Sequence, residues 1–402
     1  MQTQTDYTLT MDDIADTLAD THRHDVGLLS EDHYASLPGP IRSLRAFLLP
    51  LVHKELKPIK YIQSYHNYWL TLYFLVTANF GSHTFYVIML PLPAWLGSLN
   101  LTRDLVIVLG LGIYFSGAFK DLLCLPRPSS PPLKRLTMSH YTSTEYGCPS
   151  SHSANAIAVS TVLWYHIANN DTGLFTPSTK LWLYSGLFLY CLTLVLGRLY
   201  CGMHGLVDVT IGGLIGLATV LLRLVTKPIY DLIILSNPSL LVPVFVIAVY
   251  FAAIYYHPTP IEPCPCFEDS IAFMGVLLGL DVGYWSFTFR EGFRNYVPLE
   301  KLYQIHPSRA LFPNNNTITI FSSLLRLLIG VLLVFIWRSV AKPFFTNLIC
   351  KLRNESSSTF KKQSIYVFMS RTDTRIIVKY IVYSGIAIVT LYAKYLFEVF
   401  NV

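Results

Sequence analysis

Long apolar runs recur along this chain and restrict what it can fold into. A helix that crosses the hydrocarbon core of a membrane needs about 20 mainly apolar residues, with roughly 17 to 25 tolerated. The runs that approach this length are residues 68–80, 84–99, 105–119, 154–168, 181–196, 206–222, 240–256, 271–287, 318–337 and 376–397. Because several of them are short, we predict an all-α, polytopic membrane helical bundle of about 8 to 10 spans.

The composition also favours a membrane protein. Hydrophobic residues make up 52% of the 402 residues and charged residues only 13%, whereas soluble domains contain about 25% charged residues. The net charge of +6 is modest and spread along the chain, so nucleic acid is not an expected partner. The seven cysteines are scattered and predict no disulfide framework. The sequence Cys264-Pro265-Cys266 favours neither a disulfide nor a structural zinc site, which needs four ligands.

Charge near the first apolar run predicts an orientation and a division of the chain. Basic residues cluster just before this run: Arg42, Arg45, Lys54, Lys57 and Lys60. By the positive-inside rule, residues 1–66 form a cytosolic N-terminal tail. Residues 67–230 then form a transmembrane core, and residues 231–402 add further helices and loops. Asp281 lies inside an apolar run, which predicts a partly buried or re-entrant segment because charge within a membrane is costly.

Three polar clusters stand at the ends of apolar runs. The first, residues 120–128, contains Lys120 and Arg127 and ends in prolines that stop a helix. The second, residues 148–152, comes just before the next run, and the third, residues 197–208, lies between the two runs that follow. One run ends, the next begins and the third returns, so all three clusters meet at one face of the membrane.

The clusters contain the residue types that bind phosphate. Lys120, Arg127 and Arg198 supply positive charge, and an arginine holds phosphate oxygens with two parallel hydrogen bonds while a lysine adds a compact charge. Ser150 and Ser151 precede a predicted helix, where hydroxyl and backbone N–H groups can bind an anion at the positive end of the helix dipole. We therefore expect a phosphate site at this face.

Two histidines and an aspartate add the groups needed for cleavage. His204 and Asp208 are four residues apart, which places both side chains on one face of a helix. A carboxylate that accepts from one ring nitrogen fixes the tautomer and leaves a lone pair on the other. Such a histidine can attack phosphorus, and His152 can protonate the departing alkoxide.

The order and spacing of these residues resemble a known signature. It consists of Lys120, six residues and Arg127-Pro128; then Pro149-Ser150-Ser151-His152; then Arg198, five residues, His204, three residues and Asp208. This pattern is similar to the three-part motif of the type 2 phosphatidic acid phosphatase superfamily, which includes the lipid phosphate phosphatases. The sequences Glu145-Tyr146-Gly147 and Tyr200-Cys201-Gly202-Met203-His204 look most like those of fungal sphingosine-1-phosphate and dihydrosphingosine-1-phosphate phosphatases.

The resemblance implies a role for each of these residues. His204 is the expected nucleophile, which forms a phosphohistidine, and Asp208 orients it. His152 is the expected general acid and base. The phosphate-binding residues implied are Lys120, Arg127, Ser150, Ser151 and Arg198. Two positions depart from the superfamily pattern, since Ser151 stands where glycine is usual and Gly197 where serine usually precedes the arginine.

The resemblance also implies a substrate and a location. It predicts a metal-independent lipid phosphate monoester hydrolase without a cofactor, in the endoplasmic reticulum membrane. Together with an odd number of spans between the N-terminal tail and Lys120, it predicts an active site in the lumen. Its partners are membrane lipids and a substrate with a phosphate head and a single long chain, the phosphorylated sphingoid bases; a homodimer is left open. Phosphatidate and polyprenyl phosphate are alternative substrates. A transporter of phosphate or lipid phosphate is the alternative function, although such sites lie near the midplane on broken helices within repeats.

The side on which the site lies depends on the first two apolar runs. If residues 68–99 form two short spans, the site lies across the membrane from the N-terminal tail, in the lumen. If they form one span, the site and the tail share a side.

Overall fold

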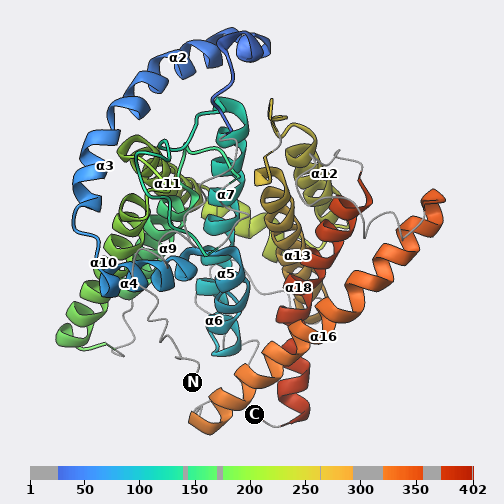
Figure 1. The fold of residues 1–402 in the computed structure, drawn as a ribbon. Helices are drawn as coiled ribbons and strands as arrows, with labels where there is room; N and C mark the ends of the chain where they lie inside the picture. The colour runs from blue at the N-terminus through green and yellow to red at the C-terminus, as the bar shows by residue number, and fades with distance from the viewer. Residues whose placement is uncertain are drawn as a thin grey trace, which may run out of the picture.

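The structure is a computed structural model that describes residues 26–138, 144–169, 175–262, 264–292, 320–355, 373–400 and 402 (Figure 1). Within these residues every regular element is a helix, and six helices are long and apolar enough to cross a membrane. These six are α7 (Leu99–Leu123), α10 (Pro177–Tyr200), α11 (Leu206–Ser236), α13 (Cys266–Gly292), α16 (Ile320–Arg353) and α18 (Thr374–Val399). The helices α9 (Ser151–Ala168) and α12 (Leu241–Tyr255) are shorter. The predicted all-α, polytopic membrane fold is confirmed.

Part of the predicted N-terminal tail is helical and is docked onto the bundle. After the short 3₁₀ helix η1 (Glu31–Ser36), α2 (Gly39–Lys54) and α3 (Leu56–Gln63) follow each other closely. The buried Arg45 of α2 donates to the carbonyl oxygen of Leu123 at 3.2 Å, at the C-terminal end of α7. Glu55 accepts a hydrogen bond from the backbone N–H of Val207 at 2.7 Å, in the first turn of α11. Residues 1–25 lie outside the described residues.

Residues 68–95 make a single, broken crossing instead of two spans. The path runs through α4 (Tyr68–Ala78), η2 (Asn79–Gly81), α5 (His83–Met89) and α6 (Leu92–Trp95). It begins beside the C-terminal end of α10, where the hydroxyls of Thr71 and Tyr200 are 2.9 Å apart. It ends next to the first residue of α7, and Figure 1 shows α2 and α6 at opposite ends of α7. Residues 26–66 and the C-terminal end of α7 therefore share one side.

A cytosolic segment 26–66 and a site across the membrane from it exclude each other in this fold. The sequence did not separate one broken crossing from two short spans, because both present two apolar runs around the polar Gly81-Ser82-His83.

Helices α9 and α11 touch through glycines. A Cβ atom on Gly212 would lie 2.3 Å from the carbonyl oxygen of Ser150, and one on Gly216 would lie 2.3 Å from that of Ala154. Any side chain at these positions would force the helices apart, and small residues are the usual means of close helix contact in membranes. The contact brings the residues before α9 next to the start of α11.

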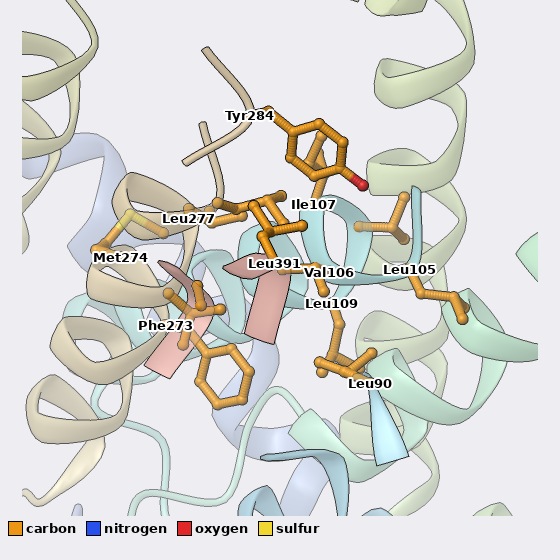
Figure 2. Packing of buried hydrophobic residues seen from close by; sticks show 14 of the residues in the cluster. Leu90, Leu105, Val106, Ile107, Leu109, Phe273, Met274, Leu277, Tyr284 and Leu391 are labelled. Atoms are coloured by element: carbon orange, nitrogen blue, oxygen red, sulfur yellow. The ribbon is translucent and has the colours of Figure 1, made fainter. Parts of the chain in front are cut away.

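The main hydrophobic core joins α7, α13 and α18. Leu105, Val106, Ile107 and Leu109 of α7 belong to one buried cluster with Phe273, Met274, Leu277 and Tyr284 of α13. Figure 2 shows Leu391 of α18 between Leu277 and Val106 in this cluster, and Leu105 on the side of α7 away from α13. Helix α7 thus has one end at the polar clusters and its length in this core, which gives those clusters a rigid support.

Buried ion pairs join the N-terminal part of α7 to α11 and α13. Arg103 contacts Asp231 at 3.0 Å and Asp281 at 3.2 Å, and Arg223 donates to Asp104 at 2.8 Å. Helix α13 is continuous through Asp281. The prediction of a buried segment is therefore confirmed, whereas the re-entrant alternative is wrong, because the paired arginine lets a full helix carry this charge.

Candidate active site

The first polar cluster is turned back onto the bundle at the end of α7. Cys124 adopts a left-handed conformation with φ of 50°, which ends the helix, and Pro126 and Pro128 prevent its continuation. Arg127 then points toward the third cluster. Its Nη1 donates to the carbonyl oxygen of Met203 at 2.6 Å and lies 3.1 Å from Nε2 of His204.

The three predicted phosphate-binding cations are all buried. The exposed fraction is 2% for Lys120, 3% for Arg127 and 5% for Arg198. Among the described residues, the buried Nε atom of Arg198 has no hydrogen-bond partner. Removing several positive charges from water is costly unless an anion compensates them. The cluster is therefore suited to bind an anion with several oxygens, such as a phosphoryl group.

His204 is held with one ring nitrogen toward Asp208 and the other toward Arg127. Its Nδ1 lies 3.4 Å from Oδ2 of Asp208, and this oxygen also accepts from the backbone N–H of Gly205 at 2.9 Å. Burial, followed by the charges of Arg127 and Arg198, lowers the pKa of His204 well below 6.5. The imidazole is therefore neutral near pH 7, with a lone pair available on Nε2 if Nδ1 carries the proton, as the nearby carboxylate favours.

The second cluster forms the start of α9. The hydroxyl oxygen of Ser150 caps this helix by accepting from the backbone N–H of Ser153 at 3.3 Å. The backbone N–H of Ser150 donates to the carbonyl oxygen of Asp208 at 2.9 Å, which ties the second cluster to the third. Ser151 and His152 occupy the first turn and are half-buried. The N-terminal end of α9, which is the positive end of its dipole, therefore lies next to the third cluster.

His152 lies close to His204 and is packed against the broken crossing. The charge of His152 is among the causes that lower the pKa of His204. A Cβ atom on Gly81 would lie 2.6 Å from the imidazole Cδ2 of His152. The ring therefore rests on the bare backbone of Gly81, a contact that no sequence motif indicated.

The structure also adds two glutamates to the site. Glu145 forms a buried ion pair with the Lys120 ammonium, and its Oε2 lies 3.7 Å from Nη2 of Arg127. Glu55 accepts from the first turn of α11, directly after His204. Glu145 was visible in the sequence only as part of the Glu145-Tyr146-Gly147 resemblance, which assigns it no role. Glu55 carried no signal, because it is far from the motifs in sequence.

The position of Gly197 explains one departure from the superfamily pattern. A Cβ atom there would lie 3.0 Å from Cδ1 of Phe74 in α4. A serine at this position would need Phe74 to shift by a few tenths of an ångström, so glycine suits the close approach of the aromatic ring.

Within the described residues, one group of side chains has the spacing of metal ligands. It consists of Asp121, Cys264 and Cys266, whose ligand atoms lie within 4.8 Å of one another. The two cysteines form a disulfide in the structure. Their sulfurs are therefore not thiolate ligands in this state, and the group contains none of the predicted site residues.

The comparison with protein families gives a match over the region that contains the three clusters. Residues 101–229, which contain all three clusters, match the model of the PAP2 superfamily. The chain belongs to the PAP2 superfamily.

Several relatives of the chain are named as phosphatases of sphingoid-base phosphates. A dihydrosphingosine 1-phosphate phosphatase of Saccharomyces cerevisiae is 40% identical over 78% of this chain and 76% of that protein. One of Schizosaccharomyces pombe is 36% identical over 74% and 69%. Sphingosine-1-phosphate phosphatase 2 of Homo sapiens is 31% identical over 71% and 68%. No solved structure matches the chain.

Proposed function

We propose that this protein is an integral-membrane phosphatase that hydrolyses phosphorylated long-chain sphingoid bases to the free base and phosphate. The observation that carries the proposal is the placement of His204, whose Nδ1 lies 3.4 Å from the Asp208 carboxylate and whose Nε2 lies 3.1 Å from one of three buried cations. A transporter would need the cations but not a nucleophile oriented by a carboxylate. The names of the relatives support sphingoid-base phosphates as substrates.

The mechanism has two steps that share one phosphate site. In the first, Nε2 of His204 attacks phosphorus, the ester P–O bond breaks, and His152 gives a proton to the departing alkoxide. Lys120, Arg127 and Arg198 hold the phosphoryl oxygens as charge develops. In the second, His152 takes a proton from water, the water oxygen attacks phosphorus, and the P–N bond to His204 breaks to release phosphate.

The substrate is tested by the release of phosphate from purified protein. The panel contains long-chain base phosphates, phosphatidate, a polyprenyl phosphate and glucose 6-phosphate at equal concentration. We expect the highest kcat/KM for the long-chain base phosphates. A higher value for phosphatidate or the polyprenyl phosphate would contradict the assigned substrate, and no release from any of them would contradict hydrolysis.

Turnover is expected to be independent of divalent cations. The buried cations Lys120, Arg127 and Arg198 supply the positive charge that Mg²⁺ supplies in metal-dependent phosphatases. Phosphate release should be the same with and without excess EDTA. Loss of activity with EDTA that Mg²⁺ restores would contradict the metal-free mechanism.

Gly81→Ala is expected to lower kcat about 10- to 100-fold. The new methyl group would displace the His152 ring, and a misplacement of about 1 Å in a catalytic group can cost about 10² in rate. Gly186→Ala is the matched control, because a Cβ atom at Gly186 meets nothing within 4 Å. Steady-state kinetics of the two variants provide the measurement. Equal activity of both variants would show that the contact with Gly81 does not position His152.

The location we propose is the endoplasmic reticulum membrane with the active site in the lumen, as the resemblance to fungal enzymes implies. Residues 26–66 share the side of the site in this fold, so they are lumenal in the proposal. The cytosolic placement of this segment is then given up, since the basic residues of α2 and α3 lie beside the site and not across the membrane from it.

Cysteine labelling tests this sidedness. Cys148 is fully buried and cannot report on it, so single cysteines are introduced at Met138 near the site, Lys57 in α3 and Ser98 before α7, all exposed, in a Cys191→Ser background. In sealed microsomes with the cytosolic face outward, an impermeant reagent should label Ser98→Cys at once, and Met138→Cys and Lys57→Cys only after detergent. Labelling of Met138→Cys without detergent would refute the lumenal site. Different behaviour of Met138→Cys and Lys57→Cys would refute the single crossing.

A further inference from the structure

The Glu145 carboxylate contacts both Lys120 and Arg127, two of the cations predicted to bind the phosphate. The carboxylate is paired with the Lys120 ammonium and lies 3.7 Å from Nη2 of Arg127. The side chain is buried, with 9% of it exposed. A phosphoryl group held by Lys120 and Arg127 therefore has to displace this carboxylate from both.

The backbone of Glu145 is fixed, so the displaced carboxylate stays near the phosphate. The carbonyl oxygen of Glu145 accepts from Nε of Arg127 at 3.0 Å. The next residue, Tyr146, is fully buried, and its hydroxyl accepts from the backbone N–H of Glu262 at 3.0 Å. Gly147 donates to the carbonyl oxygen of Leu125 at 2.8 Å and packs so closely that a Cβ atom would lie 2.5 Å from Pro126. Only the side chain of Glu145 is free to turn.

A displaced carboxylate at this depth needs a new positive partner. A buried charge that loses its partner costs much more than one that exchanges it, and the dianionic phosphate beside it would add repulsion. A long-chain base phosphate carries an ammonium group on the carbon next to the phosphate ester carbon. A substrate bound through its phosphate to Lys120 and Arg127 would bring this group within side-chain reach of the displaced carboxylate.

We propose that Glu145 binds the substrate ammonium and thereby selects long-chain base phosphates over lipid phosphates that lack an amine. The inference rests on the proposed function and goes beyond it by naming the residue that reads the amine. Glu145 shields Lys120 and Arg127 until substrate arrives, and then exchanges its two cation partners for the ammonium. A substrate without an amine leaves the carboxylate unpaired and is bound less well.

The test compares two substrates in three proteins. The substrates are a long-chain base 1-phosphate and the same molecule with hydrogen in place of the amine. The proteins are the wild type, Glu145→Gln and, as a matched control, Glu262→Gln, which neutralises another buried glutamate that contacts Gly27 and Tyr34 instead of the cations. The ratio of the two kcat/KM values is the readout, because it cancels any general loss of activity.

We expect the wild type and Glu262→Gln to favour the amine substrate by about 10- to 100-fold, as one hydrogen-bonded charge pair provides. In Glu145→Gln the ratio should fall toward one. Glu145→Asp, which keeps the charge, should retain part of the preference.

Three results would overturn the inference. A ratio of the two kcat/KM values near one in the wild type would show that the protein does not recognise the amine. This result does not depend on whether any variant folds, because it uses the wild type alone. A wild-type preference that Glu145→Gln keeps, with both kcat/KM values lowered equally, would show that Glu145 only positions Lys120 and Arg127. Failure of the wild type on every long-chain base phosphate, with activity on phosphatidate, would instead remove the proposed function and this inference with it.

Discussion

His204→Ala is expected to abolish turnover, by at least about 10⁴-fold, because loss of the nucleophile in a covalent hydrolase costs that order or more. The alanine leaves no atom that can form a bond to phosphorus. The buried cations can still bind a phosphate group. The KM for the substrate and the inhibition constant for phosphate should therefore change much less than kcat. Phosphate release from purified protein in detergent is the measurement.

His53→Ala is the control for this variant. His53 is exposed on α2 and lies outside the catalytic cluster, so its loss should leave activity within about twofold of the wild type. Activity of His204→Ala within 10-fold of the wild type would contradict the assignment of His204 as the nucleophile.

His152→Ala is expected to lower turnover of long-chain base phosphates by about 10² to 10⁴, the range of general acid–base catalysis. An alkoxide is a poor leaving group without a proton, whereas p-nitrophenolate leaves as a stable anion. The first step with p-nitrophenyl phosphate should therefore be partly spared in His152→Ala, and the phosphoenzyme should accumulate because water attack lacks its base.

A rapid-quench experiment with both substrates tests this split. His152→Ala should show a burst of p-nitrophenolate followed by slow turnover, and His204→Ala should show no burst. Equal rescue of the two variants by the activated substrate would contradict the separate roles of the histidines.

The sequence indicated that the three clusters gather in one place because their residues stand at helix ends. Lys120 and Arg127 end one apolar run, and the residues 148–152 precede the next, so parity alone placed them on one face. The structure brings His204 within 3.1 Å of Arg127 and 3.4 Å of Asp208, as that prediction requires. The chemical roles of these residues remain predictions.

Other features depended on contacts that sequence distance conceals. Glu55 reaches the start of α11 across 152 positions of chain, and no local pattern indicates such a contact. The broken crossing at residues 68–95 was ambiguous because the short apolar runs 68–80 and 84–99 fit either two short spans or the two halves of a long one. The sequence left open whether Asp281 marks a buried or a re-entrant segment, because its partner, Arg103, belongs to another helix.

The central claim is that the phosphoryl group is transferred to Nε2 of His204 before water releases it. The most direct measurement is to identify the residue that carries the phosphoryl group. Wild-type protein is mixed with long-chain base phosphate labelled in the phosphoryl group, quenched in alkali within one turnover and digested, and the labelled peptide is identified. The account predicts an alkali-stable, acid-labile label on the peptide that contains His204, formed no more slowly than phosphate is released. A label on another residue, or single-turnover release of phosphate with no label on the protein, would contradict it.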